Sequence, residues 1–388
     1  MDKKKIEIEK FFTLAIEQQG LNNLSAAQAL YNQILTLDPN HLPTYKNLAT
    51  ILFSRKEYQK AKNCYAKIIE INPNYVEAYY NRGVIFQALK ENLDAKDSYE
   101  KAIGIDPNYT EAHYNLGLIF QELRDYQKAK DYNEKAIKSN PNYQQAHYNL
   151  GLIFQELRDH QKAKICYEKV IEIDPKNLKA YNNIGVIFQE LGDYQKAKEC
   201  FEKIIKIDPD YVDAHNNLGI IFKELGEHQR AIDCYKKVIE LNPNYTKAHN
   251  NLGGIFQELG EHQKAKECFE KAIEIDPDYV DAHNNLGIIF QELGEHQRAK
   301  DCYKKVIELN PNYTKAHNNL GGIFQELGEH QKAKECFEKA IEINPNYTDA
   351  HNNLGVLFKE LGEFEKAKEC FEKAIEINPS YAKAHNNL

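Results

Sequence analysis

Histidine and cysteine are the side chains here that most readily bind metals or transfer protons, and the chain has fourteen histidines and eight cysteines. Neither set forms a cluster when the sequence is divided into units of 34 residues, numbered from position 1 at Val212. Position 4 holds His113, His147, His215, His249, His283, His317, His351 and His385, and position 17 holds His160, His228, His262, His296 and His330. All eight cysteines occupy position 23: Cys64, Cys166, Cys200, Cys234, Cys268, Cys302, Cys336 and Cys370. The spacing from His228 to Cys234 puts the two on different faces of a helix, and no CxxC or HxxxH pair accompanies them. The sequence therefore predicts no catalytic residue, no metal site, no cofactor and no enzyme activity, and we expect the position-4 histidines to be packing residues.

Two columns of primary amides run along the units. Position 6 is Asn47, Asn81, Asn115, Asn149, Asn183, Asn217, Asn251, Asn285, Asn319, Asn353 and Asn387. Position 12 is glutamine at Gln87, Gln121, Gln155, Gln189, Gln257, Gln291 and Gln325. Asparagine is a poor helix former, so its presence in the middle of a helix in every later unit indicates a role beyond helix formation. Amides donate and accept at once, so a column of them can pair with successive peptide groups of an extended chain. Duplication alone is the alternative, because copying a unit copies its asparagine whether or not it is used.

The elements that carry these columns are helical hairpins. Ala214, Leu218 and Ile221 recur at helical spacing in the first half of the unit, and Ala231, Tyr235 and Val238 do so in the second half. Gly226 stands where the first helix must end and the chain reverse. A proline at position 32 ends the second helix, and it recurs every 34 residues at Pro39, Pro73, Pro107, Pro141, Pro175, Pro209, Pro243, Pro277, Pro311, Pro345 and Pro379. A fixed period of this length predicts an all-α solenoid of tandem 34-residue helical hairpins.

The period divides the chain into a charged lead-in, residues 1–7, eleven repeats, and the start of a twelfth at residues 382–388. The repeats are 8–41, 42–75, 76–109, 110–143, 144–177, 178–211, 212–245, 246–279, 280–313, 314–347 and 348–381. The first repeat is the least regular, which is typical of a terminal cap. In the fourth repeat Asn133 replaces the aromatic residue of position 24, so we expect the local helix face to be shifted or loose there. Because residues 382–388 stop within a helix, we expect this chain to be the N-terminal part of a longer protein.

The unit resembles the tetratricopeptide repeat. The residues that carry the resemblance are His215 at position 4, Leu218 at 7, Gly219 at 8, Phe222 at 11, Ala231 at 20, Tyr235 at 24, Val238 at 27 and Pro243 at 32. The resemblance implies a right-handed superhelix in which position 6 faces a concave groove. The asparagine column is most similar to the superhelix that precedes the catalytic domain in O-linked N-acetylglucosamine transferases, where such a ladder holds the backbone of substrate proteins. If these side chains serve only the groove, replacing Asn217, Asn251 and Asn285 by alanine should leave the fold intact.

The charge pattern and the cysteines limit which partners and which cellular compartment we expect. The net charge is −8 and acidic and basic residues are interleaved, so nucleic acid is not expected as a partner. No stretch approaches the ~18 apolar residues of a membrane span, and no signal peptide is recognisable, so we expect a cytoplasmic protein with no membrane partner. Equivalent cysteines on helices that stack about 8–10 Å apart lie beyond disulfide reach, which favours reduced core thiols. Asn-Tyr-Thr sequons begin at Asn108, Asn244, Asn312 and Asn346, and they would matter only in a secreted chain.

The sequence thus predicts a scaffold that binds extended peptide segments of partner proteins in its groove. Two alternatives stay open at this point. One is the substrate-recruiting arm of a larger, glycosyltransferase-like enzyme whose catalytic domain follows residue 388. The other is a subunit of a self-assembling fibre, since the uncapped end of one array could stack on the start of the next.

Overall fold

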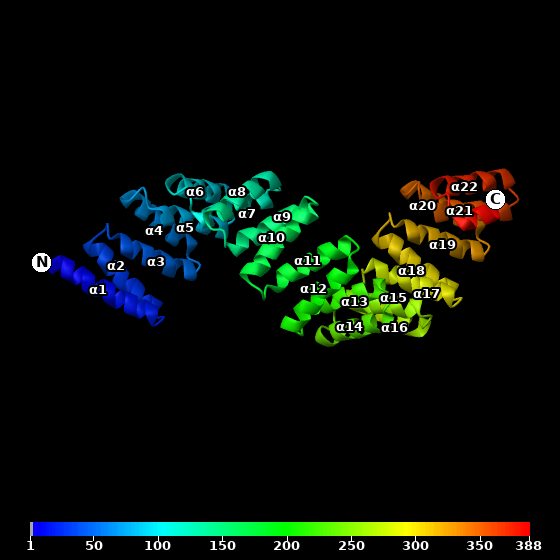
Figure 1. Cartoon of the computed structure of the whole chain (residues 1–388), viewed down its shortest axis with the longest axis horizontal. Helices are drawn as coiled ribbons and strands as arrows, with labels where there is room; N and C mark the ends of the chain where they lie inside the picture. The colour runs from blue at the N-terminus through cyan, green and yellow to red at the C-terminus, as the bar shows by residue number, and fades with distance from the viewer. Residues whose placement is uncertain (1–2) are drawn as a thin grey trace. The chain divides into compact units, whose positions relative to one another are not determined.

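The computed structural model describes residues 3–388, and all regular structure within that range is α-helical, with 23 helices and no strand. The contacts divide the chain into two compact units, Met1–Ile187 and Phe188–Leu388. In each unit the helices follow one another as packed pairs, such as α7 with α8 and α15 with α16 (Figure 1). The predicted all-α array of helical hairpins is therefore confirmed.

The helices have regular lengths after the first hairpin. The earlier helices are α1 (Lys3–Gly20), α2 (Leu24–Leu37), α3 (Leu42–Ser54), α4 (Tyr58–Ile71), α5 (Val76–Ala88), α6 (Asn92–Ile105), α7 (Thr110–Glu122), α8 (Tyr126–Ser139), α9 (Gln144–Glu156), α10 (His160–Ile173) and α11 (Leu178–Glu190). The later helices are α12 (Tyr194–Ile207), α13 (Val212–Glu224), α14 (His228–Leu241), α15 (Thr246–Glu258), α16 (His262–Ile275), α17 (Val280–Glu292), α18 (His296–Leu309), α19 (Thr314–Glu326), α20 (His330–Ile343), α21 (Thr348–Glu360), α22 (Phe364–Ile377) and α23 (Ala382–Asn387).

The hairpin of α13 and α14 shows why the unit folds in this way. Leu218 and Ile221 of α13 and Val238 of α14 are buried, so the two apolar stripes face one another. Gly226, between the helices, has a φ of +73°, a conformation that glycine adopts without steric cost. In the first unit five residues other than glycine hold the same turn with φ between 57° and 62°: Asn22, Lys56, Lys90, Arg124 and Arg158.

The small residue at position 8 allows the two helices of a hairpin to approach. A Cβ placed on Gly219 would lie 2.6 Å from the ring of Tyr235, and one on Gly253 would lie 2.7 Å from the ring of Phe269. Both rings are fully buried. The aromatic residue at position 24 therefore lies directly against the glycine backbone of the first helix, in agreement with the prediction from the sequence.

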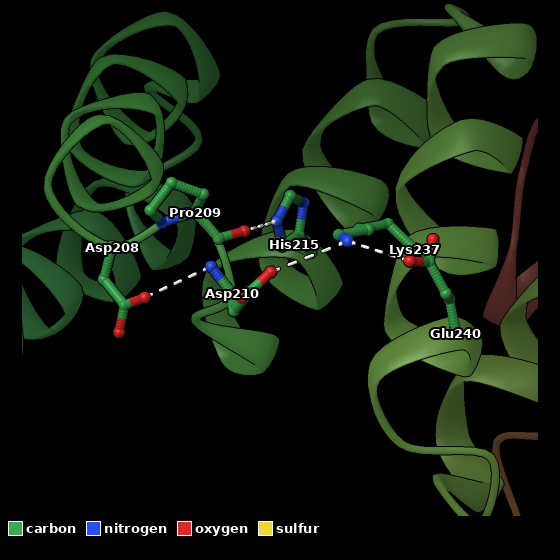
Figure 2. Close-up of polar contacts among 6 residues, drawn as sticks. All are labelled: Asp208, Pro209, Asp210, His215, Lys237 and Glu240. Carbon is green, nitrogen blue, oxygen red and sulfur yellow. Dashed lines mark hydrogen bonds and ion pairs between the residues drawn. The ribbon is translucent and has the colours of Figure 1, made fainter.

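The position-4 histidines join each repeat to the loop before it. Nε2 of His215 lies 2.8 Å from the carbonyl oxygen of Pro209, in the loop before α13 (Figure 2). A carbonyl only accepts, so Nε2 carries the proton. The backbone N–H of Asp210 donates to Asp208 in the same loop, and Lys237 lies 3.6 Å from the Asp210 carboxylate (Figure 2). The other seven position-4 histidines make the same contact at 2.9 to 3.0 Å: His113, His147, His249, His283, His317, His351 and His385. Their packing role is confirmed.

The repeat that contains Asn133 keeps its helices in register. Helix α8 has the same 14-residue length as α6 and α10, so the expected shift of the helix face is wrong. Asn133 occupies the aromatic slot, fully buried, and its Nδ2 donates to the carbonyl of Ala129 at 2.8 Å. Its Oδ1 is buried without a hydrogen-bond partner among residues 3–388. Tyr132 lies outside the slot and stacks on Phe120 with 5.4 Å between ring centroids. The repeat thus retains its shape at the cost of an unpaired buried carbonyl.

Candidate protein-interaction face

The position-6 asparagines lie on the face of each first helix that is turned away from the hairpin core. In α17, Asp281 and Glu292 are exposed and Asn285 and Ile288 are half-buried, at spacings of four, three and four residues. The opposite stripe of the same helix includes Ile289, which is fully buried. We call the stripe formed by positions 2, 6, 9 and 13 of the first helices the amide face.

A second asparagine row lies beside the first and was missed in the sequence. Position 5 is asparagine at Asn216, Asn250, Asn284, Asn318 and Asn352, and all five are buried. Nδ2 of Asn285 donates to Oδ1 of Asn250 at 3.1 Å, and Nδ2 of Asn353 donates to Oδ1 of Asn318 at 3.0 Å. Position 6 of one repeat is therefore bonded to position 5 of the repeat before it. The signal was available, since position 5 is an unbroken asparagine from Asn182 onward, but its variation in the earlier repeats hid it.

Within one helix the position-5 asparagine donates to the position-6 asparagine. Nδ2 of Asn284 lies 3.3 Å from Oδ1 of Asn285, which accepts this bond. Matching bonds run from Asn216 to Asn217, from Asn318 to Asn319 and from Asn352 to Asn353, at 3.2 to 3.4 Å. At the end of the array Asn387 donates to Asn352 at 3.0 Å. The second unit thus holds its position-6 amides in a hydrogen-bonded ladder that crosses from repeat to repeat.

In the second unit the bonds between neighbouring repeats follow the residue at position 24. Asn285 and Asn353 follow the phenylalanine slots of Phe269 and Phe337, and both donate to the preceding asparagine. Where the slot holds tyrosine, the buried Oδ1 atoms of Asn216 and Asn284 have no hydrogen-bond partner among residues 3–388. In the first unit a tyrosine hydroxyl itself accepts the bond: Asn47 donates to Tyr31 at 3.2 Å and Asn115 to Tyr99 at 3.1 Å. In the second unit the bond from position 6 to the preceding position-5 asparagine is thus seen after the phenylalanine slots of Phe269 and Phe337 and is absent after the tyrosine slots of Tyr235 and Tyr303.

The bond from Asn285 to Asn250 leads us to expect, unlike the sequence alone, that alanine at position 285 lowers the stability of the fold. Its removal would leave the buried Oδ1 of Asn250 without its donor, which costs about 1–3 kcal/mol. Asn251 and Asn319 differ, because they do not bond to Asn216 and Asn284.

The ladder orients each amide and leaves part of it available. A primary amide has two N–H donors and two acceptor positions on oxygen. Asn285 uses one N–H on Asn250 and one acceptor position on Asn284. Asn353 uses one of each in the same way. One donor and one acceptor position remain on each half-buried side chain within the part of the chain that the structure describes.

The glutamine column is also engaged within the protein. The hydroxyls of Tyr99 and Tyr167 donate to Gln87 and Gln155 in the same repeats, at 2.5 Å, and Tyr303 donates to Gln291 at 3.3 Å. Gln257 and Gln291 donate to Glu292 and Glu326 of the following repeats, at 3.3 and 3.2 Å. The remaining predicted residues are half-buried: Asn81, Gln121, Gln189 and Gln325.

The first unit carries a different position-5 row, made of tyrosines. Asn115 donates to Tyr80 at 3.5 Å in addition to Tyr99, and Asn183 donates to Tyr148 at 3.2 Å. Asn149 is the exception in this column. It is 4% exposed and its buried Nδ2 lacks a hydrogen-bond partner among residues 3–388. Its repeat follows Asn133, where the tyrosine hydroxyl that would accept its bond is missing.

The edge of the amide face is acidic. Glutamate occupies position 13 in the later repeats, and Nδ1 of His262 and of His296 lies 3.1 Å from Glu292 and Glu326. Across residues 3–388 no group of three or more histidine, cysteine or acidic side chains is placed to hold a metal ion. In the same range no helix combines the length and the apolar character needed to cross a membrane.

The cysteine column lies apart from the amide face, on the second helices. All eight side chains are free thiols, two of them buried and six half-buried. Burial raises the pKa of Cys64 to about 11 and that of Cys166 to about 12. Thiols with raised pKa values are poor nucleophiles and poor metal ligands at neutral pH, because the thiolate is the reactive form.

The sequence matches a family model described as Tetratricopeptide repeat at residues 76–109, 110–143, 145–177, 178–211, 212–245, 314–347 and 348–381. A second model with that description matches residues 244–312, and one described as TPR repeat matches residues 49–90. A search of curated proteins found no match.

Several solved structures are similar over part or all of the chain. YrrB, described as a TPR protein with an unusual peptide-binding site, is 28% identical over 49% of this chain and 97% of its own, with a TM-score of 0.41. MamA is 32% identical over 42% of this chain and 96% of its own, with a TM-score of 0.39. A chain of the APC/C hetero-tetramer Cut9-Hcn1 aligns with 98% of this chain and 96% of its own at 13% identity and a TM-score of 0.51, which shows a shared fold alone. Because the first family model by itself covers more than half of the sequence, the chain belongs to the tetratricopeptide repeat family, whose members serve as protein-interaction scaffolds.

Proposed function

We infer that this protein binds extended segments of partner polypeptides along the amide face, mainly through hydrogen bonds to the partner's main chain. The proposal rests on which hydrogen-bonding groups of the position-6 amides are already used within the protein and which remain. In the second unit Asn285 and Asn353 are fixed by one donated and one accepted bond, and each retains one N–H and one acceptor position.

That remaining pair is complementary to a peptide group. Each residue of an extended chain presents one N–H and one C=O, so a single amide side chain can bond to both kinds of group. Since neighbouring side chains already fix the asparagine rotamers, binding loses little side-chain entropy. First helices about 8–10 Å apart and an extended rise of about 3.3 Å per residue match one asparagine to about every third residue of the partner.

The test needs asparagines whose loss disturbs the fold least, and Asn251 and Asn319 are chosen because neither donates to a buried position-5 carbonyl, although Asn319 accepts one bond from Asn318. A peptide is first selected from a random display library against the whole chain. Calorimetric titration then compares the parent with the double variant Asn251→Ala, Asn319→Ala. We expect the double variant to bind about 5- to 100-fold more weakly, since each net hydrogen bond contributes about 0.5–1.5 kcal/mol.

A matched control changes the outer helix. Lys237 belongs to α14, a second helix, and lies beside Asp210 and Glu240 (Figure 2). Lys236→Ser with Lys237→Ser should leave the affinity within about twofold of the parent, because exposed ion pairs contribute little. Equal affinity of the asparagine variant and the parent would contradict the proposal, as would a larger loss in the lysine control.

A further inference from the structure

A pocket lies beside two position-5 tyrosines of the first unit, Tyr114 and Tyr148. Its volume is about 220 Å³, and its lining residues are Tyr114, Gln144, Gln145, Tyr148, Asn177 and Lys179. Two aromatic rings, three amides and one ammonium group therefore surround a space open to solvent. The pocket lies wholly within the first unit.

In the two repeats before it, a tyrosine at position 34 packs against the tyrosine at position 5. The rings of Tyr80 and Tyr109 have centroids 5.2 Å apart. The rings of Tyr114 and Tyr143 lie 5.5 Å apart in an edge-on arrangement at 73°. In the next repeat position 5 is again tyrosine, Tyr148, but position 34 is Asn177. This repeat therefore has no position-34 ring to pack against Tyr148.

The surroundings of Tyr143 identify the pocket as the place of the missing ring. Burial raises the pKa of Tyr143 to about 12, with further contributions from Glu111, Tyr80 and Tyr114, so these three groups are its neighbours. One repeat later the equivalent residues are Gln145, Tyr114 and Tyr148. All three line the pocket.

Asn177 does not fill the vacant place. Its Oδ1 accepts a hydrogen bond from the backbone N–H of Ala180 at 3.0 Å, so the side chain caps the start of α11. The side chain is thereby engaged at the helix end, and its volume is smaller than that of the tyrosine ring. The rings of Tyr114 and Tyr148 are left with a hollow between them.

We propose that this pocket binds the aromatic ring of a tyrosine side chain carried by a partner polypeptide. The proposal rests on the proposed function in one respect, that the ring belongs to a segment lying along the same face. The ring would contact Tyr114 and Tyr148 as Tyr143 contacts its own neighbours, and edge-on aromatic pairs are favourable.

The polar lining selects tyrosine over phenylalanine. In the second unit the position-34 hydroxyls of Tyr245 and Tyr313 donate to the position-2 carboxylates of Asp213 and Asp281, both at 3.3 Å. Position 2 of the pocket repeat is Gln145, whose Oε1 is a neutral acceptor at the equivalent place. The hydroxyl of a bound tyrosine therefore has an acceptor that phenylalanine cannot use.

The experiment uses N-acetyltyrosinamide as the probe and the whole chain as the receptor, with binding followed by saturation-transfer difference NMR. We expect a dissociation constant on the order of a millimolar, which is usual for a ligand of this size. N-acetylphenylalaninamide should bind about 2- to 10-fold more weakly, and N-acetylalaninamide should give no transfer.

The key variant is Asn177→Tyr, which supplies the missing ring from the chain itself and should abolish transfer to the probe. Asn142→Tyr is the matched control, since Asn142 is an exposed residue of the equivalent preceding loop and does not line the pocket. The control should bind the probe as the parent does. Gln145→Leu is a milder second variant, and it should remove the preference for tyrosinamide over phenylalaninamide while the rings still bind.

The outcomes separate this site from the proposed function. Undiminished probe binding by a folded Asn177→Tyr variant, or an unchanged preference in Gln145→Leu, would overturn the pocket proposal. So would the absence of probe binding by the parent. Because the probe has no extended backbone, its binding supports the pocket even if the variants at Asn251 and Asn319 leave peptide affinity unchanged.

Discussion

At the scale of single residues, Asn133 is the clearest departure from the repeat. It places an amide in a slot that is aromatic in the other ten repeats, and it leaves its own Oδ1 and the Nδ2 of Asn149 unpaired. In the third repeat the equivalent Tyr99 is fully buried, donates to Gln87 and accepts from Asn115. A tyrosine at position 133 would therefore find Gln121 and Asn149 as the corresponding partners.

We predict that Asn133→Tyr raises the free energy of unfolding of the first unit by about 2 kcal/mol or more, because it fills the slot and pairs two amides. Urea unfolding of the whole chain, with hydrogen exchange of α7 and α8, measures the change. An exposed Asn142→Tyr serves as the control and should shift neither quantity. If Asn133→Tyr slows folding and does not raise the free energy of unfolding, the slot does not accommodate a tyrosine ring and the prediction is wrong.

The cysteines give a pH-dependent prediction. Burial raises the pKa values of all eight thiols to about 11 or 12. At pH 8 the thiolate fraction of the folded protein should be more than ~100-fold below that of the unfolded chain, whose thiols titrate near 8.5. Iodoacetamide should therefore label the native protein at least ~100-fold more slowly than the protein in urea. Labelling of all eight within minutes under native conditions would contradict this.

The same shift predicts alkaline destabilisation. The unfolded chain loses its thiol protons from about pH 8.5, whereas the folded chain keeps them until about pH 11. The unfolded state thus binds fewer protons in this window, so the free energy of unfolding falls as pH rises through it. Urea midpoints measured from pH 7 to 11 should decline above pH 8.5, and replacing Cys64 and Cys166 by alanine should make the decline shallower.

At the scale of helices, the ladder separates two kinds of position-6 asparagine. Asn285 and Asn353 each supply the donor to a buried carbonyl, whereas Asn251 and Asn319 do not. We predict that Asn285→Ala with Asn353→Ala lowers the free energy of unfolding of the second unit by about 2–6 kcal/mol, at about 1–3 kcal/mol per unpaired group. The pair Asn251→Ala with Asn319→Ala should lower it less, because it removes the acceptor of one long bond from Asn318 and no donor to a buried carbonyl. Equal melting curves for the two double variants would contradict the ladder.

The hairpins were predictable from the sequence because their causes are local. The turn at Gly226, the stop at Pro243 and the close approach at Gly219 each depend on the backbone preferences or the size of one residue. The ladder was not predictable in this way. Whether Asn285 reaches Asn250 depends on how one first helix stacks on the next, and on whether a tyrosine hydroxyl competes for the donor. The amide columns were predicted as positions, but their internal partners required the three-dimensional packing.

At the scale of the whole molecule, each repeat contacts chiefly its neighbours, so the repeats need not unfold together. We predict more than one unfolding transition in urea. Hydrogen exchange should be faster in α7 to α9, which contain the unpaired groups of Asn133 and Asn149, than in α13 to α16. Uniform protection of all helices would contradict this prediction.

The alternation of tyrosine and phenylalanine at position 24 has a consequence for how such a chain can change in length. Residues 212–279 and 280–347 carry the same order of slots, Tyr235 then Phe269 and Tyr303 then Phe337. Excising 280–347 would join Tyr279 to Thr348, and this junction repeats the one now formed by Tyr347 and Thr348. Every asparagine that remained would keep the kind of hydrogen-bond partner that it has now. The array can thus be shortened or extended by two repeats at a time without changing the hydrogen bonds of the others. The length of the partner segment that the proposed amide face holds would change in the same steps.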